Sequence, residues 1–128
     1  MAAPTESQLA RLKLAIVQKA VRLLVLPEAP FGSFGEITEY GRTAVRPDFA
    51  IKELLYGFRG KDFNTYDEDG ELVEEFDIDD VVVTSDDVIR MGFDDPEVFT
   101  AEREADVDAA IDAAKSWVAD YIAGVGVA

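Results

Sequence analysis

The end of the sequence constrains the fold most, because its apolar residues follow one helical face. Between residues 102 and 122 they recur in steps of four, three, four and three, at Val107, Ile111, Ala114, Val118 and Tyr121. Such steps place a continuous stripe along one side of a helix, and that stripe needs a partner element to bury it. We therefore expect a helix from about Thr100 to Ile122, ended by the glycines that follow.

A second long helix is predicted near the N-terminus. Thr5 and Gln8 have the spacing of a capping box, in which each side chain accepts a hydrogen bond from the backbone N–H of the other residue. The helix should end near Leu26, because Pro27 cannot continue it. Its expected apolar residues are Leu9, Leu12, Ile16, Val17, Ala20, Val21, Leu23 and Leu24. So broad a face predicts burial against more than one neighbour.

Shorter elements are predicted between the two long helices. Residues 27–47 combine proline, glycine and aromatic residues, which favour a connection with short strands ordered by the aromatic side chains. Asp48 is expected to cap a short helix that runs through Tyr56. The apolar face of that helix would consist of Ile51, Leu54, Leu55 and Phe58.

Residues 61–78 predict a β-hairpin. Asp69-Gly70 is typical of a two-residue type I′ turn. Such a loop would set three pairs across the hairpin: Tyr66 with Val73, Phe63 with Phe76, and Glu68 with Glu71. The two aromatic pairs favour this register, whereas the facing glutamates oppose it by up to about 1 kcal/mol. A short extended run, 81–83, follows the hairpin.

A third helix is predicted from about Asp86 to Gly92, because Thr84 and Asp87 repeat the capping-box spacing. Asp95-Pro96 predicts one further turn. The expected fold class is therefore mainly α with a small β-hairpin (α+β). We expect a helical bundle framed by the long N-terminal and C-terminal helices, in a single domain over 1–128.

Charge divides the sequence into two unlike halves. Residues 1–60 hold 8 basic and 6 acidic side chains, a net charge of +2, whereas residues 61–128 hold 4 basic and 21 acidic, a net charge of −17. Repulsion among these carboxylates is screened to roughly 3 Å in 1 M salt. A chain rich in Asp, Ala and Val with 5 lysines is typical of a salt-loving organism. The alternative is an ordinary acidic protein with a solvated acidic half. Neither half has a basic patch for gripping duplex DNA.

Catalytic and metal sites are not expected. The chain has no histidine and no cysteine, which excludes imidazole bases, thiol chemistry and zinc sites with nitrogen or sulfur ligands. An EF-hand loop centred on Gly70 would need Asp and Glu where Thr65 and Phe76 stand. The aspartates between 77 and 87 are a weak candidate for a hard cation, because 27 acidic residues produce such clusters without a site. We predict no enzyme, no cofactor, no metal and no membrane span.

The last helix also carries the candidate interface residues. Trp117 and Tyr121 are four residues apart and therefore neighbours on the helix surface. Aromatic residues at this spacing usually belong to the core. The alternative is that Trp117 lies at the flank of the apolar stripe, which already includes Tyr121, and anchors a partner. With the apolar tail that follows, the candidate set is Trp117, Tyr121, Val125 and Val127.

Residues 81–122 combine a short capped helix, a glycine-containing break, an acidic linker and a long helix. The carrying residues are Val83-Thr84-Ser85-Asp86-Asp87-Val88, then Gly92-Phe93-Asp94-Asp95, then Asp108, Ile111, Ala114, Trp117 or Val118, and Tyr121. This pattern resembles the head–tail connector, or adaptor, proteins of tailed viruses. In that family the pattern usually lies near the N-terminus, whereas here it lies near the C-terminal end and follows a segment with a hairpin.

The resemblance implies a structural role in the neck of a virion, after assembly in the host cytoplasm. Copies of the chain would form a ring that joins the portal to other neck or tail proteins. Packaged DNA would pass nearby without specific binding, because the acidic half repels it. Two alternatives stay open. One is another neck protein, for head completion or tail termination. The other is an acidic binding module, a nucleic-acid mimic, that engages a basic partner. The several separate apolar helical faces favour the ring.

Overall fold

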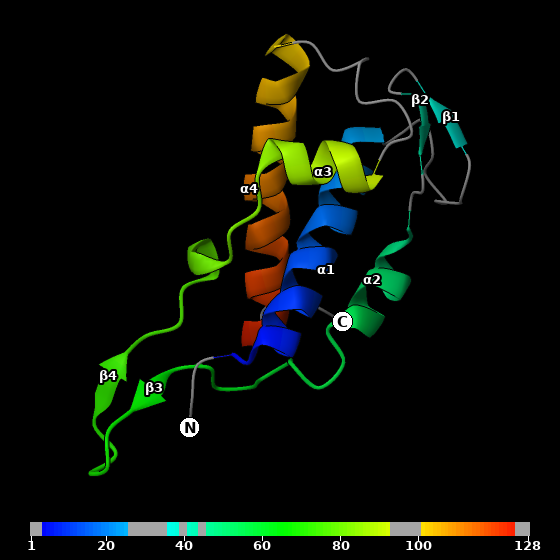
Figure 1. Ribbon diagram of the computed structural model, residues 1–128. Helices are drawn as coiled ribbons and strands as arrows, with labels where there is room; N and C mark the ends of the chain where they lie inside the picture. Colours follow the sequence, from blue (N-terminus) through cyan, green and yellow to red (C-terminus); the bar gives the residue numbers. More distant parts are fainter. Residues whose placement is uncertain (1–3, 26–35, 39–40, 44–45, 93–100, 125–128) are drawn as a thin grey trace.

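Two long antiparallel helices form the centre of the molecule. The computed structural model describes residues 4–25, 36–38, 41–43, 46–92 and 101–124. Helices α1 and α4 make the most extensive contact between elements and run in opposite directions (Figure 1). The elements in chain order are α1 (Glu6–Val25), β1 (Glu36–Thr38), β2 (Gly41–Thr43), α2 (Asp48–Leu54), β3 (Thr65–Tyr66), β4 (Leu72–Glu74), the 3-10 helix η1 (Ile78–Asp80), α3 (Ser85–Gly92) and α4 (Ala101–Ala123). This architecture confirms the predicted mainly helical fold with a small antiparallel sheet.

The two predicted capping boxes define where α1 and α3 begin. Thr5 N donates to Gln8 Oε1 at 2.9 Å, and Gln8 N donates to Thr5 Oγ1 at 3.2 Å. Thr84 N donates to Asp87 Oδ2 at 3.0 Å, and Asp87 N donates to Thr84 Oγ1 at 3.2 Å. Each box satisfies backbone N–H groups that have no partner inside the helix. Both predicted helix starts are confirmed to within one residue.

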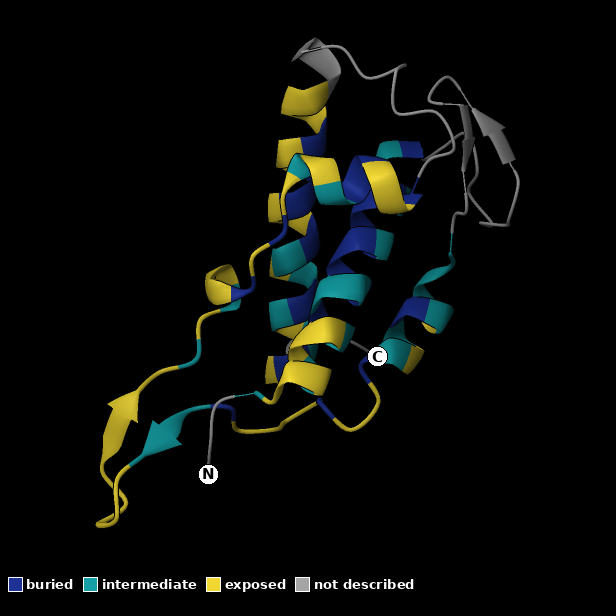
Figure 2. Cartoon of the chain, in the orientation of Figure 1, coloured by how far each residue is buried: buried dark blue, intermediate teal, exposed yellow. Residues whose placement is uncertain are grey.

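The core lies where α1 faces α2, α3 and α4 (Figure 2). Its largest fully buried side chains are Leu12, Ile16, Val17, Val21, Val25, Ile51, Leu55, Val88, Val107 and Val118. Burial of such a side chain contributes about 1.5–3 kcal/mol relative to its exposure. The stripe predicted for α4 is confirmed, with Tyr121 half-buried at its end. Leu9 was expected on the buried face of α1 but is 37% exposed, because it lines an open groove beside the β3–β4 hairpin.

Helix α2 begins differently from the prediction. Pro47 is the N-cap residue and makes no side-chain capping bond, and Asp48 is already helical. The Asp48 carboxylate points instead to α1, where it binds Lys19 and Arg22. The predicted Asp48 cap is therefore wrong, because a partner from a distant part of the chain outcompetes the local bond. The helix ends at Leu54, two residues before the predicted end.

The β3–β4 hairpin keeps the predicted register away from its tip but not at the tip. Thr65 pairs with Glu74, whereas Tyr66 pairs with Leu72 instead of Val73. The reason is a three-residue loop in place of the expected two-residue turn. Asp67 N donates to Glu71 O at 2.9 Å, and Gly70 adopts a positive φ of 81° between them. This is a type I turn with a glycine bulge, and the predicted Glu68–Glu71 pair does not form.

Two further short elements, the β1–β2 pair and η1, lie outside the helical core. Strands β1 and β2 pair antiparallel, in agreement with the short strands predicted for this connection. The aromatic residues expected to order it (Phe31, Phe34 and Tyr40) lie outside the described residues, as do Asp95-Pro96. Helix η1 was not predicted. Its N-cap residue is Asp77, whose carboxylate accepts a hydrogen bond from Asp79 N at 2.9 Å, and the helix packs on α4.

Candidate interaction surfaces

Trp117 and Tyr121 form a stacked pair on α4. Their ring centroids lie 6.4 Å apart with an interplanar angle of 23°. The Lys19 ammonium lies 4.5 Å from the Trp117 ring, and the Arg59 guanidinium 5.7 Å from the Tyr121 ring. A cation over an aromatic face is worth about 0.5–2 kcal/mol, depending on desolvation. Both rings are half-buried and pack against the core, so each contributes to the fold while it keeps an exposed part.

The structure thus brings together two of the four candidate interface residues. Val125 and Val127 lie outside the described residues. An anchoring role for Trp117 stays a prediction, as does the role of the apolar tail. The two cations over the rings could not be read from the sequence, since Lys19 comes from α1 and Arg59 follows α2.

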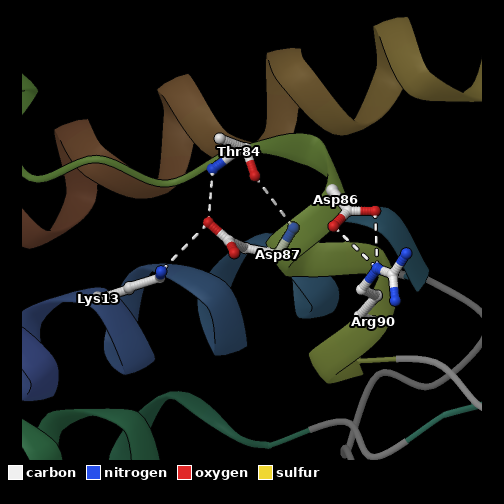
Figure 3. A network of polar contacts seen from close by, with 5 residues as sticks. All are labelled: Lys13, Thr84, Asp86, Asp87 and Arg90. Atoms are coloured by element: carbon white, nitrogen blue, oxygen red, sulfur yellow. Dashed lines mark hydrogen bonds and ion pairs between the residues drawn. The ribbon is translucent and has the colours of Figure 1, made fainter.

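A network of polar contacts holds α3 against α1 (Figure 3). Besides closing its capping box, Asp87 places Oδ2 3.3 Å from the Nζ atom of Lys13. The backbone N–H of Thr84, and to a smaller extent the Lys13 ammonium, lower the pKa of Asp87 below its usual range. Asp86 and Arg90, one turn apart on the outer side of α3, form an exposed ion pair. This cluster is structural, because its carboxylates already have partners.

The β3–β4 hairpin forms an arm that projects from the helices (Figure 1). We define the arm as residues 65–75. Its base is anchored by Phe63 and Phe76, whose rings lie 5.4 Å apart and which were predicted to face each other. All three residues of β4 are exposed, including Leu72 at 55% and Val73 at 64% (Figure 2). Exposed neighbouring apolar residues on a strand with an open edge are typical of a surface that another chain covers.

A second exposed apolar surface lies on α2 and the turn after it. Phe49 is 71% exposed and Tyr56 is 82% exposed, and Lys52 lies between them in the sequence. We call these three residues the α2 patch. The Arg11 guanidinium lies next to it, where it donates to the carbonyl oxygens of Leu54 and Tyr56 at 2.8 Å each. The patch therefore combines two aromatic rings with the cations of Lys52 and Arg11, beside the exposed carboxylate of Glu53.

The outer face of α4 is acidic and otherwise carries small side chains. Its exposed residues are Glu104, Ala105, Asp106, Asp108, Ala109, Asp112, Ala113, Ser116 and Asp120. Among these described exposed residues there is no large apolar group and no cation to hold a polyanion. It is a third surface, distinct in chemistry from the arm and from the α2 patch.

The described residues hold no group of three or more His, Cys, Asp or Glu residues that is placed to bind a metal ion. A groove of about 410 Å³ between the arm base and the end of α4 includes Asp62 in its lining. Asp62 accepts hydrogen bonds from the Tyr66 hydroxyl at 2.6 Å and from Asn64 N at 2.8 Å, and these bonds lower its pKa. A carboxylate so held is a poor proton donor at neutral pH.

The comparisons leave the function to be inferred from these surfaces. No protein-family model matches the chain, and no match was found among curated proteins or solved structures. None of the described helices has the length and apolar character needed to cross a bilayer.

Proposed function

We propose that this chain is a structural subunit of a closed ring and acts as a head–tail connector of a tailed virus. The observation that supports the ring is the position of the two exposed apolar surfaces. The arm and α2 lie on opposite sides of the α1–α4 pair (Figure 1). Two unlike surfaces on opposite sides are what a head-to-tail contact requires, and repetition of such a contact closes a ring when the rotation permits.

The acidic face of α4 supports the connector role of that ring. A channel that DNA crosses must not hold the phosphates, and a lining of carboxylates with small residues meets this requirement. In the proposed ring this face of α4 is turned to the channel. The resemblance of residues 81–122 to connector proteins also supports the connector role. The short helix and the long helix of the resembling pattern correspond to α3 and α4.

Sedimentation velocity of the full chain in dilute buffer and in 2 M KCl tests this proposal. Copies with a net charge of −15 repel each other at low ionic strength, and salt screens that repulsion. We expect one discrete species in KCl with a mass that is a large multiple of 14.0 kDa. A monomer at every protein concentration in KCl would contradict self-assembly.

One observation favours a second candidate, an acidic module that mimics nucleic acid. Glu104, Asp108 and Asp112 form a row on the exposed face of α4, with a rise of about 6 Å between neighbours. Replacement of these three residues by Gln, Asn and Asn separates the two functions. A mimic would lose binding to a basic partner such as oligolysine. A ring subunit would still assemble, and its channel face would begin to retain duplex DNA.

A further inference from the structure

We propose that the arm of one copy docks on the α2 patch of the next copy. This inference rests on the proposed ring function and identifies the two surfaces that meet. Within one copy the arm and α2 are separated by the α1–α4 pair, so a chain cannot cover its own patch (Figure 1). Each copy therefore offers one arm and one patch to different neighbours.

The apolar groups of the two surfaces complement each other. Leu72 and Val73 are consecutive in a strand and point to opposite faces of the arm, so the helices of the same copy cannot cover both. The α2 patch presents two large aromatic rings, which are the residues most often found as anchors at the centre of protein interfaces. The aliphatic side chain on one face of the arm, laid against Phe49 and Tyr56, buries exposed apolar surface on both copies.

The charges select this pairing over a contact between two arms. The carboxylates of Glu71, Glu74 and Glu75 border Leu72 and Val73, and within the described ranges none of them has a cation at ion-pair distance. Lys52 likewise has no carboxylate partner among the residues described. Arm-to-arm contact would set carboxylates against carboxylates. Contact with α2 sets them against Lys52 and Arg11, which fixes orientation and register.

Single cysteines test this pairing directly, because the chain has none of its own. A Val73→Cys variant is mixed with a Tyr56→Cys variant in KCl and treated with a short bismaleimide. We expect a cross-linked heterodimer, and a ladder of higher multimers from the chain that carries both substitutions. Val82→Cys mixed with Tyr56→Cys is the matched control, because Val82 is as exposed as Phe49 but lies outside both surfaces. It should cross-link only at background level.

A charge swap supplies the second measurement. Lys52→Glu in the Tyr56→Cys chain should lower the initial cross-linking rate by about two- to fivefold, as expected for a peripheral ion pair. Glu74→Lys in the Val73→Cys chain should restore it. Sedimentation of the uncross-linked wild type distinguishes failure of the arm–patch contact from failure of ring assembly. Multimers that give no 73–56 product, or only 73–73 dimers, overturn the arm–patch contact and leave the ring. A monomer without cross-linking overturns both proposals.

Discussion

The Nζ atom of Lys19 lies 2.8 Å from Oδ1 of Asp48, although only 7% of Lys19 is exposed. This ion pair joins the middle of α1 to the first turn of α2, and Arg22 Nε approaches the same carboxylate oxygen at 3.5 Å. The Trp117 ring covers the other side of the ammonium. One lysine therefore ties three helices together at the point where α2 supports its exposed patch.

The first prediction is that the two partners of the Lys19–Asp48 pair differ in how much their replacement destabilises the fold. Asp48→Asn leaves a nearly buried ammonium group without a carboxylate, and we expect a loss of about 1–3 kcal/mol in the free energy of unfolding. Lys19→Met keeps the aliphatic contact with Trp117 and leaves Asp48 with Arg22, so its cost should be about 1 kcal/mol or less. Urea denaturation of both variants measures this. A larger loss for Lys19→Met than for Asp48→Asn would refute the assignment.

The second prediction concerns pH and Asp87. Its pKa is lowered in the folded protein, so the carboxylate stabilises the fold above its unfolded pKa, near 3.8, and this contribution is lost as the pH falls through the folded pKa. Asp87→Asn should therefore cost about 1 kcal/mol at pH 7. In acid, below the folded pKa, wild type and variant should converge. Urea denaturation at a series of pH values follows the difference.

Asp86→Asn is the control for that experiment, because Asp86 lies next to Asp87 but forms only an exposed pair with Arg90. We expect a change of about 0.5 kcal/mol or less. Equal effects of the two substitutions at pH 7 would mean that the Thr84–Asp87 box does not hold the start of α3.

The third prediction concerns the end of α3. Gly92 is buried against α1, and a Cβ added there would overlap the Val21 side chain. Gly92→Ala should destabilise the protein by about 1–3 kcal/mol, the usual cost of overpacking a core. In a Val21→Ala background the same change should cost clearly less, because the space is then open. A double-mutant cycle without coupling would contradict the close approach of α3 and α1.

Local sequence patterns predicted the elements whose causes are local. Thr5 with Gln8 and Thr84 with Asp87 satisfy backbone groups three residues away, so their spacing alone identifies two helix starts. The apolar steps of α4 likewise predict its buried side. The prediction that Asp48 caps α2 was wrong, because its partner, Lys19, is 29 residues distant in sequence and no nearby residue indicates this contact. The predicted two-residue turn at the hairpin tip was wrong, because the Asp67 carboxylate accepts hydrogen bonds from Asp69 N and Glu71 N. These bonds favour a longer loop than Asp-Gly alone suggests.

The candidate surfaces were harder to predict than the fold. Trp117 and Tyr121 could be paired from their spacing. Phe49, Tyr56, Leu72 and Val73 could not be assigned to a surface, because an exposed apolar residue and a core residue look alike in a sequence. The one available signal was the run of glutamates around Leu72 and Val73, which is unusual for a buried strand.

The fourth prediction concerns salt. Most carboxylates of residues 61–128 that the structure describes are exposed, and repulsion among them opposes the folded state in dilute buffer. Thermal unfolding in 2 M KCl should therefore occur at a clearly higher temperature than in dilute buffer. Circular dichroism at 222 nm follows the helices during heating. A midpoint that is unchanged or lower in KCl would argue against adaptation to high salt.

Electron microscopy of the full chain in 2 M KCl shows whether unlike surfaces meet and whether the assembly closes. We expect closed rings with a fixed number of copies and an open centre, and we expect these rings to be lost in a chain that carries Leu72→Asp and Val73→Asp in the arm. Two-fold dimers, open filaments, or rings that survive both arm substitutions would contradict the proposed ring.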